Sequence, residues 1–192
     1  MHKHKALHRI LFAALAASMM TTEAILVIEG RWQEAFPLHL CSVSAIMAAC
    51  LALFPGQILL DALWYLGMPG AALALLFPAP AVSRFQLLLT GSYILTHAMI
   101  LIIPVCRMAA GMRPRGGRTG WMMLFLLALS AAAHAVNVRL HTDFLFLEAP
   151  PPGTPLERVY AAGYVPYLLF LLGMMSVLCM IMDDLARRLA RK

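Results

Sequence analysis

The side chains best suited to covalent chemistry are a cysteine, Cys41, and histidines that lie near it in the chain or on a later apolar segment. Cys41 ends the stretch Pro37-Leu38-His39-Leu40-Cys41, where one apolar segment has ended and the next begins, and His97 lies in a later apolar segment. A thiol becomes a nucleophile when a nearby base removes its proton, and histidine is the usual base. The pair predicts acyl transfer through a thioester, with Cys41 as nucleophile and His97 as base.

Other polar side chains lie on the apolar segments and could bind substrate or orient the imidazole. Tyr93 precedes His97 by one helical turn, and His134 and Asn137 share one face of a later segment. Polar groups inside a bilayer are costly, so they indicate function or specific pairing. Tyr93, Asn137 and Glu23 stay open as alternatives for the group that orients His97. The residues expected to bind or orient are His39, Tyr93, His134, Asn137 and Glu23.

The composition indicates a polytopic membrane protein. Hydrophobic residues make up 62% of the 192 residues and charged residues 12%, with a mean hydropathy of +0.80. In soluble domains about 45–50% of the residues are apolar and about 25% are charged. The basic residues flank the apolar segments instead of forming an aromatic-rich soluble face, which argues against nucleic acid as a partner. We therefore expect one membrane domain over residues 1–192, with membrane lipids as its partners and no separate soluble catalytic domain. The sequence leaves the oligomeric state open.

Six apolar stretches meet the length of about 17–25 residues that a spanning helix needs. The third contains Gly67-Met68-Pro69-Gly70, which can kink the helix or let a neighbour approach closely. An all-α bundle of six transmembrane helices follows. The predicted spans are residues 9–28, 38–54, 58–77, 85–105, 121–140 and 166–182.

The distribution of basic residues predicts the orientation of this bundle. If the N-terminus is inside, the inner flanks hold 11 Lys and Arg residues and the outer loops hold 4, which favours both termini in the cytoplasm. Cys41, His97 and His134 then face a polar cavity in the outer half of the bilayer. The connection 141–165 carries Pro150-Pro151-Pro152-Gly153 beside the apolar run 144–147, and it could cover that cavity as a lid.

Metal and cofactor chemistry has little support in the sequence. The four cysteines show no CxxC spacing, so neither a zinc site nor a disulfide framework is expected. Two functions compete with acyl transfer. One is a small transporter or channel with a cavity lined by Glu23, His97 and His134. The other is a b-type haem protein with His97 and His134 as axial ligands, which ranks last because neither helix repeats its histidine on the same face.

The expected depths of Cys41 and His97 raise a geometric question. Cys41 lies a few residues from the start of its predicted span, whereas His97 follows Phe85 by 12 residues, or about 18 Å along a helix. The two side chains meet only if the fourth span starts later, the second starts earlier, or the segment before the second span dips below the membrane surface.

Four short motifs in sequence order resemble the YwaF-type bacterial integral membrane proteins. No single motif is specific, but their order and spacing match over about residues 37–166. The motifs are Pro37-Leu38-His39-Leu40-Cys41-Ser42; Tyr65-Leu66-Gly67-Met68-Pro69-Gly70-Ala71; Thr96-His97 before Pro104; and Asn137 with Thr142-Asp143-Phe144-Leu145-Phe146-Leu147.

This resemblance implies a function as well as a fold. The bacterial family is similar to the animal transmembrane acyltransferases that move acyl chains between phospholipids, including ether phospholipids. In that family a cysteine of the second-helix motif and a later histidine are taken as the catalytic pair, and Cys41 and His97 stand at the matching positions. The resemblance implies a location in the bacterial inner membrane, and it implies no cofactor. Asp143 stands where bacterial members commonly have Asn, and residues 159–167 lack a Gly-Pro-Trp-Pro-Trp run.

Overall fold

The computed structural model describes residues 2–78 and 82–191, with side chains from residue 6 onward. Throughout this part of the chain the regular structure is helical, which confirms the all-α fold class. The contacts divide the chain into two compact units, residues 1–114 and 115–192. Each unit is described by itself, and a single domain over the whole chain stays a prediction.

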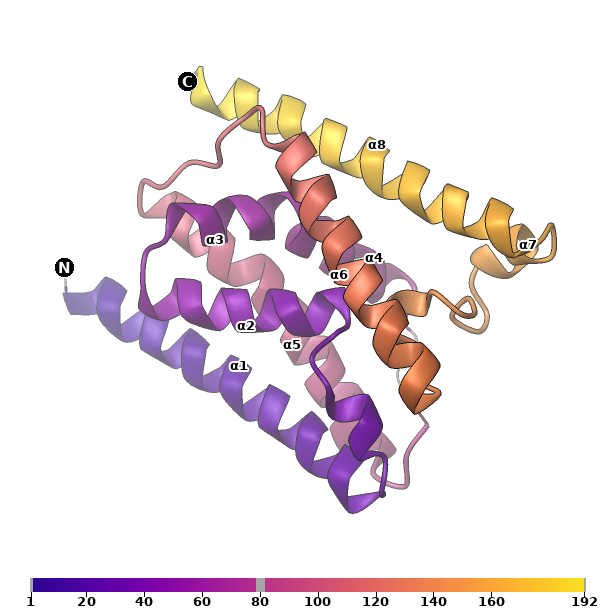
Figure 1. Cartoon of the computed structure of the whole chain (residues 1–192). Coiled ribbons are helices and arrows are strands. Elements are labelled where there is room, and N and C mark those ends of the chain that lie inside the picture. The colour runs from indigo at the N-terminus through magenta and orange to yellow at the C-terminus, as the bar shows by residue number, and fades with distance from the viewer. Residues whose placement is uncertain (1, 79–81, 192) are drawn as a thin grey trace. The chain divides into compact units, whose positions relative to one another are not determined.

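The first unit consists of three long helical rods and one short apolar helix (Figure 1). The third apolar rod is continuous but changes its helix type twice along its length. The elements are α1 (His2–Ile28), η1 (Trp32–Ala35), α2 (Leu40–Leu53), α3 (Gln57–Ala62), η2 (Leu63–Gly67), α4 (Met68–Leu76) and α5 (Gln86–Ala109).

The second unit consists of two long helices and the connection between them. The α6 helix packs along α8, and the connection packs against both helices through its two short helical turns. The elements are α6 (Thr119–Leu140), η3 (Phe144–Phe146), α7 (Leu156–Tyr160) and α8 (Tyr164–Ala190).

Five helical segments among the described residues are long and apolar enough to cross a membrane. They are residues 6–28, 57–76, 86–109, 119–140 and 164–190, and each overlaps a predicted span. The remaining predicted span, 38–54, contains only the 14 residues of α2. A helix of that length extends about 21 Å, which is shorter than the hydrocarbon core of about 30 Å. Six full-length spans are therefore not confirmed.

The core of the first unit depends on small residues in α2. Ala45, Ala48 and Ala52 are almost completely buried, because α2 packs against both α1 and α5 (Figure 1). Side chains of this size allow close approach of helix backbones, which is how membrane helices gain packing energy without a hydrophobic driving force. The same cluster contains Leu15 from α1 and Ile100 from α5, so it fixes three helices against one another.

The helix 57–76 contains one π-helical turn where the sequence predicts a kink or a close approach. Met68 donates its backbone N–H to Leu63 O, five residues earlier. Pro69 follows, and it has no N–H and crowds the carbonyl of the preceding turn. The wider π turn accommodates this ring while the helix continues. A Cβ at Gly67 would lie 3.2 Å from Ser44 Oγ, so the close approach is confirmed.

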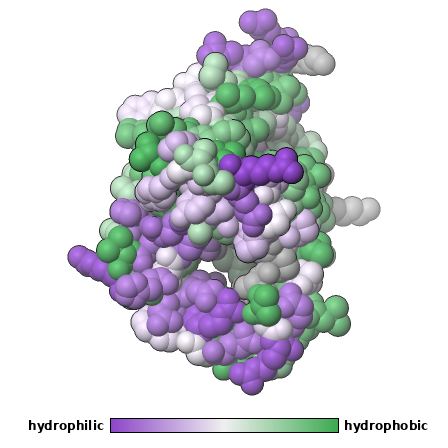
Figure 2. Space-filling model, turned by 90° about the vertical axis from the view of Figure 1, so that its right-hand side faces the viewer, coloured by the Kyte–Doolittle hydropathy of each residue, from purple (hydrophilic) through white to green (hydrophobic). Residues whose placement is uncertain are grey.

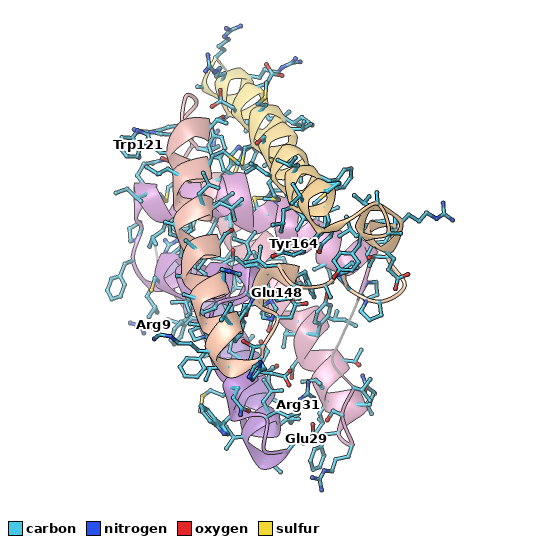
Figure 3. The ribbon with its side chains drawn as sticks, turned by 45° about the vertical axis from the view of Figure 1, so that its right-hand side comes forward. Arg9, Glu29, Arg31, Trp121, Glu148 and Tyr164 are labelled. Atoms are coloured by element: carbon cyan, nitrogen blue, oxygen red, sulfur yellow. The ribbon has the colours of Figure 1, made fainter. Side chains whose placement is uncertain are left out.

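A charged cluster holds the end of α1 against the start of α5. Figure 2 shows hydrophilic surface at the bottom of the view, the level at which α1 ends and α5 begins, and Figure 3 shows Glu29 close to Arg31 there. Glu29 accepts hydrogen bonds from Ser83 Oγ at 2.7 Å and from the Arg84 N–H at 3.0 Å. Arg31 donates to Glu34 and to Val82 O. Charge pairing therefore joins two segments more than 50 residues apart.

Candidate functional site

Cys41 lies in the first turn of α2, where its side chain is half-buried against the core of the first unit. The helix begins at Leu40, directly after His39 in an extended conformation and a tight turn at Pro37, and no side chain caps its first turn. The Cys41 sulfur interacts with the backbone N–H groups of Cys41 and Ser42 and with the Ser42 side chain. N–H groups at a helix start favour a thiolate, but burial of the sulfur opposes its ionisation more strongly, so the thiol needs a base to become a nucleophile.

His97 is buried in α5 with its ring orientation fixed. Its Nδ1 lies 2.7 Å from Tyr93 O, and a carbonyl oxygen can only accept, so Nδ1 carries the proton. The Nε2 atom of the neutral imidazole is then the basic nitrogen. The ring of Tyr93 packs on that of His97 with centroids 4.2 Å apart. Of the three alternatives for the orienting group, the structure provides Tyr93, through its backbone and its ring.

The phenol of Tyr93 also fixes α5 against α4. It donates a hydrogen bond to Ala74 O at 2.9 Å. Four residues earlier on α4, a Cβ at Gly70 would lie 3.4 Å from Leu40 Cδ2 at the start of α2. Because α4 runs from the level of Leu40 toward that of Tyr93, the residues one turn after Tyr93 lie beside the start of α2.

Contacts at the other ends of α2 and α5 also indicate how these two helices are aligned. Arg107 donates from Nε to Leu51 O at 2.8 Å and from Nη2 to Ala52 O at 2.7 Å. His97 precedes Arg107 by ten residues and Cys41 precedes Leu51 by ten, which is about 15 Å along each helix. Cys41 and His97 therefore lie at about the same level of two neighbouring helices.

Two of the three routes proposed for the depth difference are not observed. The α5 helix starts at Gln86 and α2 starts at Leu40, so the fourth helix does not start late and the second does not start early. The third route, a segment before α2 that lies below the membrane surface, stays a prediction for η1 and the bent residues 36–39. In the part of the chain that the structure describes, no hydrogen bond joins Cys41 to His97.

His39 and Glu23 occupy the same unit in different settings. His39 is the residue before α2, and burial lowers its pKa against a smaller opposing effect of Glu34. The side chain of His39 is therefore neutral at pH 7 and suits a structural or orienting role. Glu23 is half-buried in α1. Among the residues that the structure describes, Glu23 forms no ion pair with a histidine.

His134 and Asn137 belong to the second unit, so their convergence with Cys41 and His97 stays a prediction. His134 is exposed, and its Nδ1 lies 3.1 Å from Glu148 Oε1. Asn137 is buried. The Asn137 amide donates to Phe144 O and accepts from the Phe144 N–H at 2.8 Å, which indicates a structural role in holding the connection after α6.

The proposed lid is folded into the second unit through its apolar run. Phe144 is 1% exposed, so it is part of the core of this unit. Tyr167 Oη donates to Phe146 O at 2.6 Å, while Asp143 accepts from the Glu148 N–H at 2.9 Å. Burial raises the pKa of the Asp143 carboxyl. The run 144–147 is therefore anchored to α6 and α8.

Three polar residues of the first unit have positions that differ from what the sequence suggests for them: Arg107 and Asp61 as charges at the membrane surface, and Ser44 as a polar neighbour of Cys41. In the sequence, Arg107 was counted only as a topology signal. Ser44 is 1% exposed and follows Cys41 by three residues, a helical spacing that could have identified it from sequence. Asp61 is also 1% exposed and accepts from Gln57 Nε2 at 2.9 Å, so it is fully inside the protein and not at its interface with the membrane surface.

A metal site finds no support in the described residues, where no group of three or more His, Cys, Asp or Glu side chains could hold an ion. The proposed haem ligands, His97 and His134, lie in different units. Neither cofactor enters the chemistry considered below.

Comparison with known proteins gives one match. No curated protein and no solved structure matches the chain. The model of the TMEM164 family, a family of transmembrane proteins, matches residues 1–183. That match covers both units and agrees with five apolar helices of spanning length among the described residues. The chain is therefore a multi-pass membrane protein that belongs to the TMEM164 family.

Proposed function

We propose that this protein transfers an acyl chain between membrane phospholipids, with Cys41 as the nucleophile and His97 as the base. The observation that carries the proposal is that Cys41 and His97 each precede by ten residues the contact of Arg107 with the end of α2, which argues for a common level of the two side chains. A helix start around Cys41 and a defined basic nitrogen on His97 support it. The YwaF-type motifs add a family resemblance to acyltransferases.

The reaction would proceed in two steps that return the protein to its starting state. His97 Nε2 takes the proton of the Cys41 thiol as sulfur attacks the ester carbonyl of a donor phospholipid. The tetrahedral intermediate collapses, and the leaving lysophospholipid oxygen takes the proton from His97. In the second step a hydroxyl of the acceptor lysophospholipid gives its proton to His97 and attacks the thioester. The Cys41 sulfur leaves and regains its proton.

We also propose the orientation and the location of the site. The excess of Lys and Arg in the predicted inner flanks favours both termini in the cytoplasm. With this orientation Cys41 enters from the outer side, which faces the outer leaflet of the bacterial inner membrane. A donor and an acceptor lipid would then reach the site from within that leaflet, without crossing the bilayer.

Acyl transfer by the purified full chain in liposomes tests this function. The liposomes contain phosphatidylcholine with one isotope-labelled acyl chain and a lysophosphatidylethanolamine acceptor, and mass spectrometry follows the label. We expect transfer by the wild type, an acyl adduct on Cys41, and no transfer by Cys41→Ala. Cys179→Ala is the matched control, because Cys179 is a buried cysteine on α8 in the other unit. Unchanged transfer by Cys41→Ala would overturn the proposal.

A further inference from the structure

Ser44 has a buried hydroxyl that the two-residue mechanism does not use. The side chain is 1% exposed, and among the described residues its Oγ has no hydrogen-bond partner. A serine inside a helix commonly donates to the carbonyl four residues earlier, and Ser44 does not. Leaving a buried hydroxyl unpaired costs about 1–3 kcal/mol, so its retention at this position needs a reason.

The position of Ser44 relates it directly to Cys41. Three residues separate them on α2, so they occupy the same face one turn apart. Helix side chains lean toward the N-terminus, which directs the Ser44 hydroxyl toward the turn that carries Cys41. On its other side lies the π turn, where a Cβ at Gly67 would be 3.2 Å from Oγ. A glycine at this point lets the π turn pack closely against the hydroxyl.

We propose that the Ser44 hydroxyl donates a hydrogen bond to the oxyanion that forms when Cys41 attacks the lipid ester. The inference rests on the proposed function and adds a catalytic residue to it. The tetrahedral carbon is bonded to the Cys41 sulfur, so its oxygen lies near the first turn of α2. The backbone N–H groups of Cys41 and Ser42, which face the sulfur, are further donors for this oxygen. The oxyanion formed from the ester substrate thus supplies the hydrogen-bond acceptor that the Ser44 hydroxyl lacks in the protein.

Ser44→Ala tests the role through two rates measured on the same purified full chain. The first is single-turnover acylation of Cys41 by labelled phosphatidylcholine in liposomes. The second is alkylation of Cys41 by N-ethylmaleimide, a reaction that forms no oxyanion at an ester carbonyl. Removal of one oxyanion donor lowers acylation about 10²- to 10³-fold, and we expect the alkylation rate to stay unchanged. Ser176→Ala is the control, since Ser176 is a serine on α8 in the other unit whose hydroxyl donates to Leu172 O.

The outcomes separate this inference from the function on which it rests. Wild-type acylation by Ser44→Ala, in a protein that Cys41→Ala inactivates, would overturn the role of Ser44 and leave the function standing. An equal fall in acylation and alkylation would also overturn it, because that pattern indicates a structural role. Transfer by Cys41→Ala would overturn both. Ser44→Thr retains a hydroxyl donor, and we expect it to acylate faster than Ser44→Ala even if Ser44→Ala is poorly folded.

Discussion

The hydrogen bond between His97 and Tyr93 gives the two nitrogens of the His97 imidazole different roles. Nδ1 lies 2.7 Å from Tyr93 O and is occupied by this bond, so only Nε2 remains to move a proton. A side chain that bonds to its own helix one turn earlier keeps its orientation when the neighbouring helices move. The imidazole is therefore positioned before any lipid binds, which reduces the entropy lost at the reaction step.

Two substitutions of His97 distinguish the two nitrogens. Asn places an amide N–H near the position of Nδ1, whereas Gln places its amide near the position of Nε2. We expect both variants to lose about 10²- to 10⁴-fold in transfer rate, because neither amide is a base. His97→Asn should be more stable than His97→Gln by about 1 kcal/mol, the usual net value of one hydrogen bond. Equal thermal unfolding of the two variants in detergent would contradict the role of the Tyr93 bond.

The sequence predicted the candidate pair but not its geometry. Cys41 and His97 stand out as a thiol and an imidazole in apolar surroundings, and the spacing to Tyr93 is visible from the numbers alone. The bond, however, runs to the backbone of Tyr93, and no residue type reveals that. The unpaired hydroxyl of Ser44 was not predicted because a serine in a membrane helix ordinarily bonds to its own backbone, and only the structure shows that this one does not.

At the scale of elements, Arg107 sets the register between α2 and α5. Its guanidinium donates to Leu51 O and Ala52 O, two carbonyls at the end of α2 that lack partners within the helix. A cation at a helix C-terminus also interacts favourably with the helix dipole. The residue expected from the sequence to serve only as a charge at the membrane surface thus has a specific partner on another helix.

Replacing Arg107 should weaken the first unit and disturb the level of Cys41 relative to His97. Hydrogen bonds from a charged donor contribute about 1.5–3 kcal/mol, so we expect Arg107→Met to lower the free energy of unfolding by about 2 kcal/mol and to slow acyl transfer. Thermal unfolding and the transfer assay measure the two effects. Arg113→Met is the matched control, because among the described residues the Arg113 guanidinium bonds to Met108 O and Met112 O, near it in the chain. Equal losses in both variants would contradict the register role.

The positions of the helices were the most predictable part of the fold. The short length of α2 and the π turn were the least predictable. Apolar runs of spanning length predict helices because lipid offers no partner for a free backbone group. The short α2 was not foreseen, since residues 38–54 are as apolar as the other runs. Its length depends on where η1 and the bent residues 36–39 bring the chain into the bundle. The π turn before Pro69 was also invisible, although the sequence marked the place.

For the whole molecule, the division into two units separates the predicted site residues. Cys41, His97, Tyr93, His39 and Glu23 lie in residues 1–114, whereas His134 and Asn137 lie in residues 115–192. The helical spacing of polar residues predicts a shared face on each helix but not the distance between helices. Asn137 was proposed as an orienting group for His97, and the structure gives it local partners in Phe144 and Thr142 instead.

The charged cluster at the end of α1 makes the stability of the first unit depend on pH. The hydrogen bond from Ser83 lowers the pKa of Glu29 below its ordinary value of 4.5, with further contributions from Arg84 and Arg31. A carboxyl whose pKa is lower in the folded state stabilises that state above the pKa of the unfolded chain. This stabilisation is lost as the pH falls from 4.5 through the pKa of the folded protein.

Glu29→Gln should remove this part of the pH dependence. We expect the melting temperature of the wild type in detergent to fall below pH 4.5, and that of Glu29→Gln to change less over the same range. Glu157→Gln is the control, because Glu157 is a carboxylate of the other unit. A wild type and a Glu29→Gln variant with parallel melting curves would show that this cluster does not link stability to pH.

The length of α2, 14 residues, also affects how the protein is accommodated in the lipid bilayer. A helix shorter than the hydrocarbon core is accommodated when the bilayer thins around it or when flanking residues sink toward it. Either adjustment would bring lipid ester groups, which lie at the boundary of the hydrocarbon, down to the depth of the first turn of α2. Under the proposed acyl transfer, the shortness of α2 would therefore make substrate access depend on membrane thickness, and thinner bilayers would present their esters closer to Cys41.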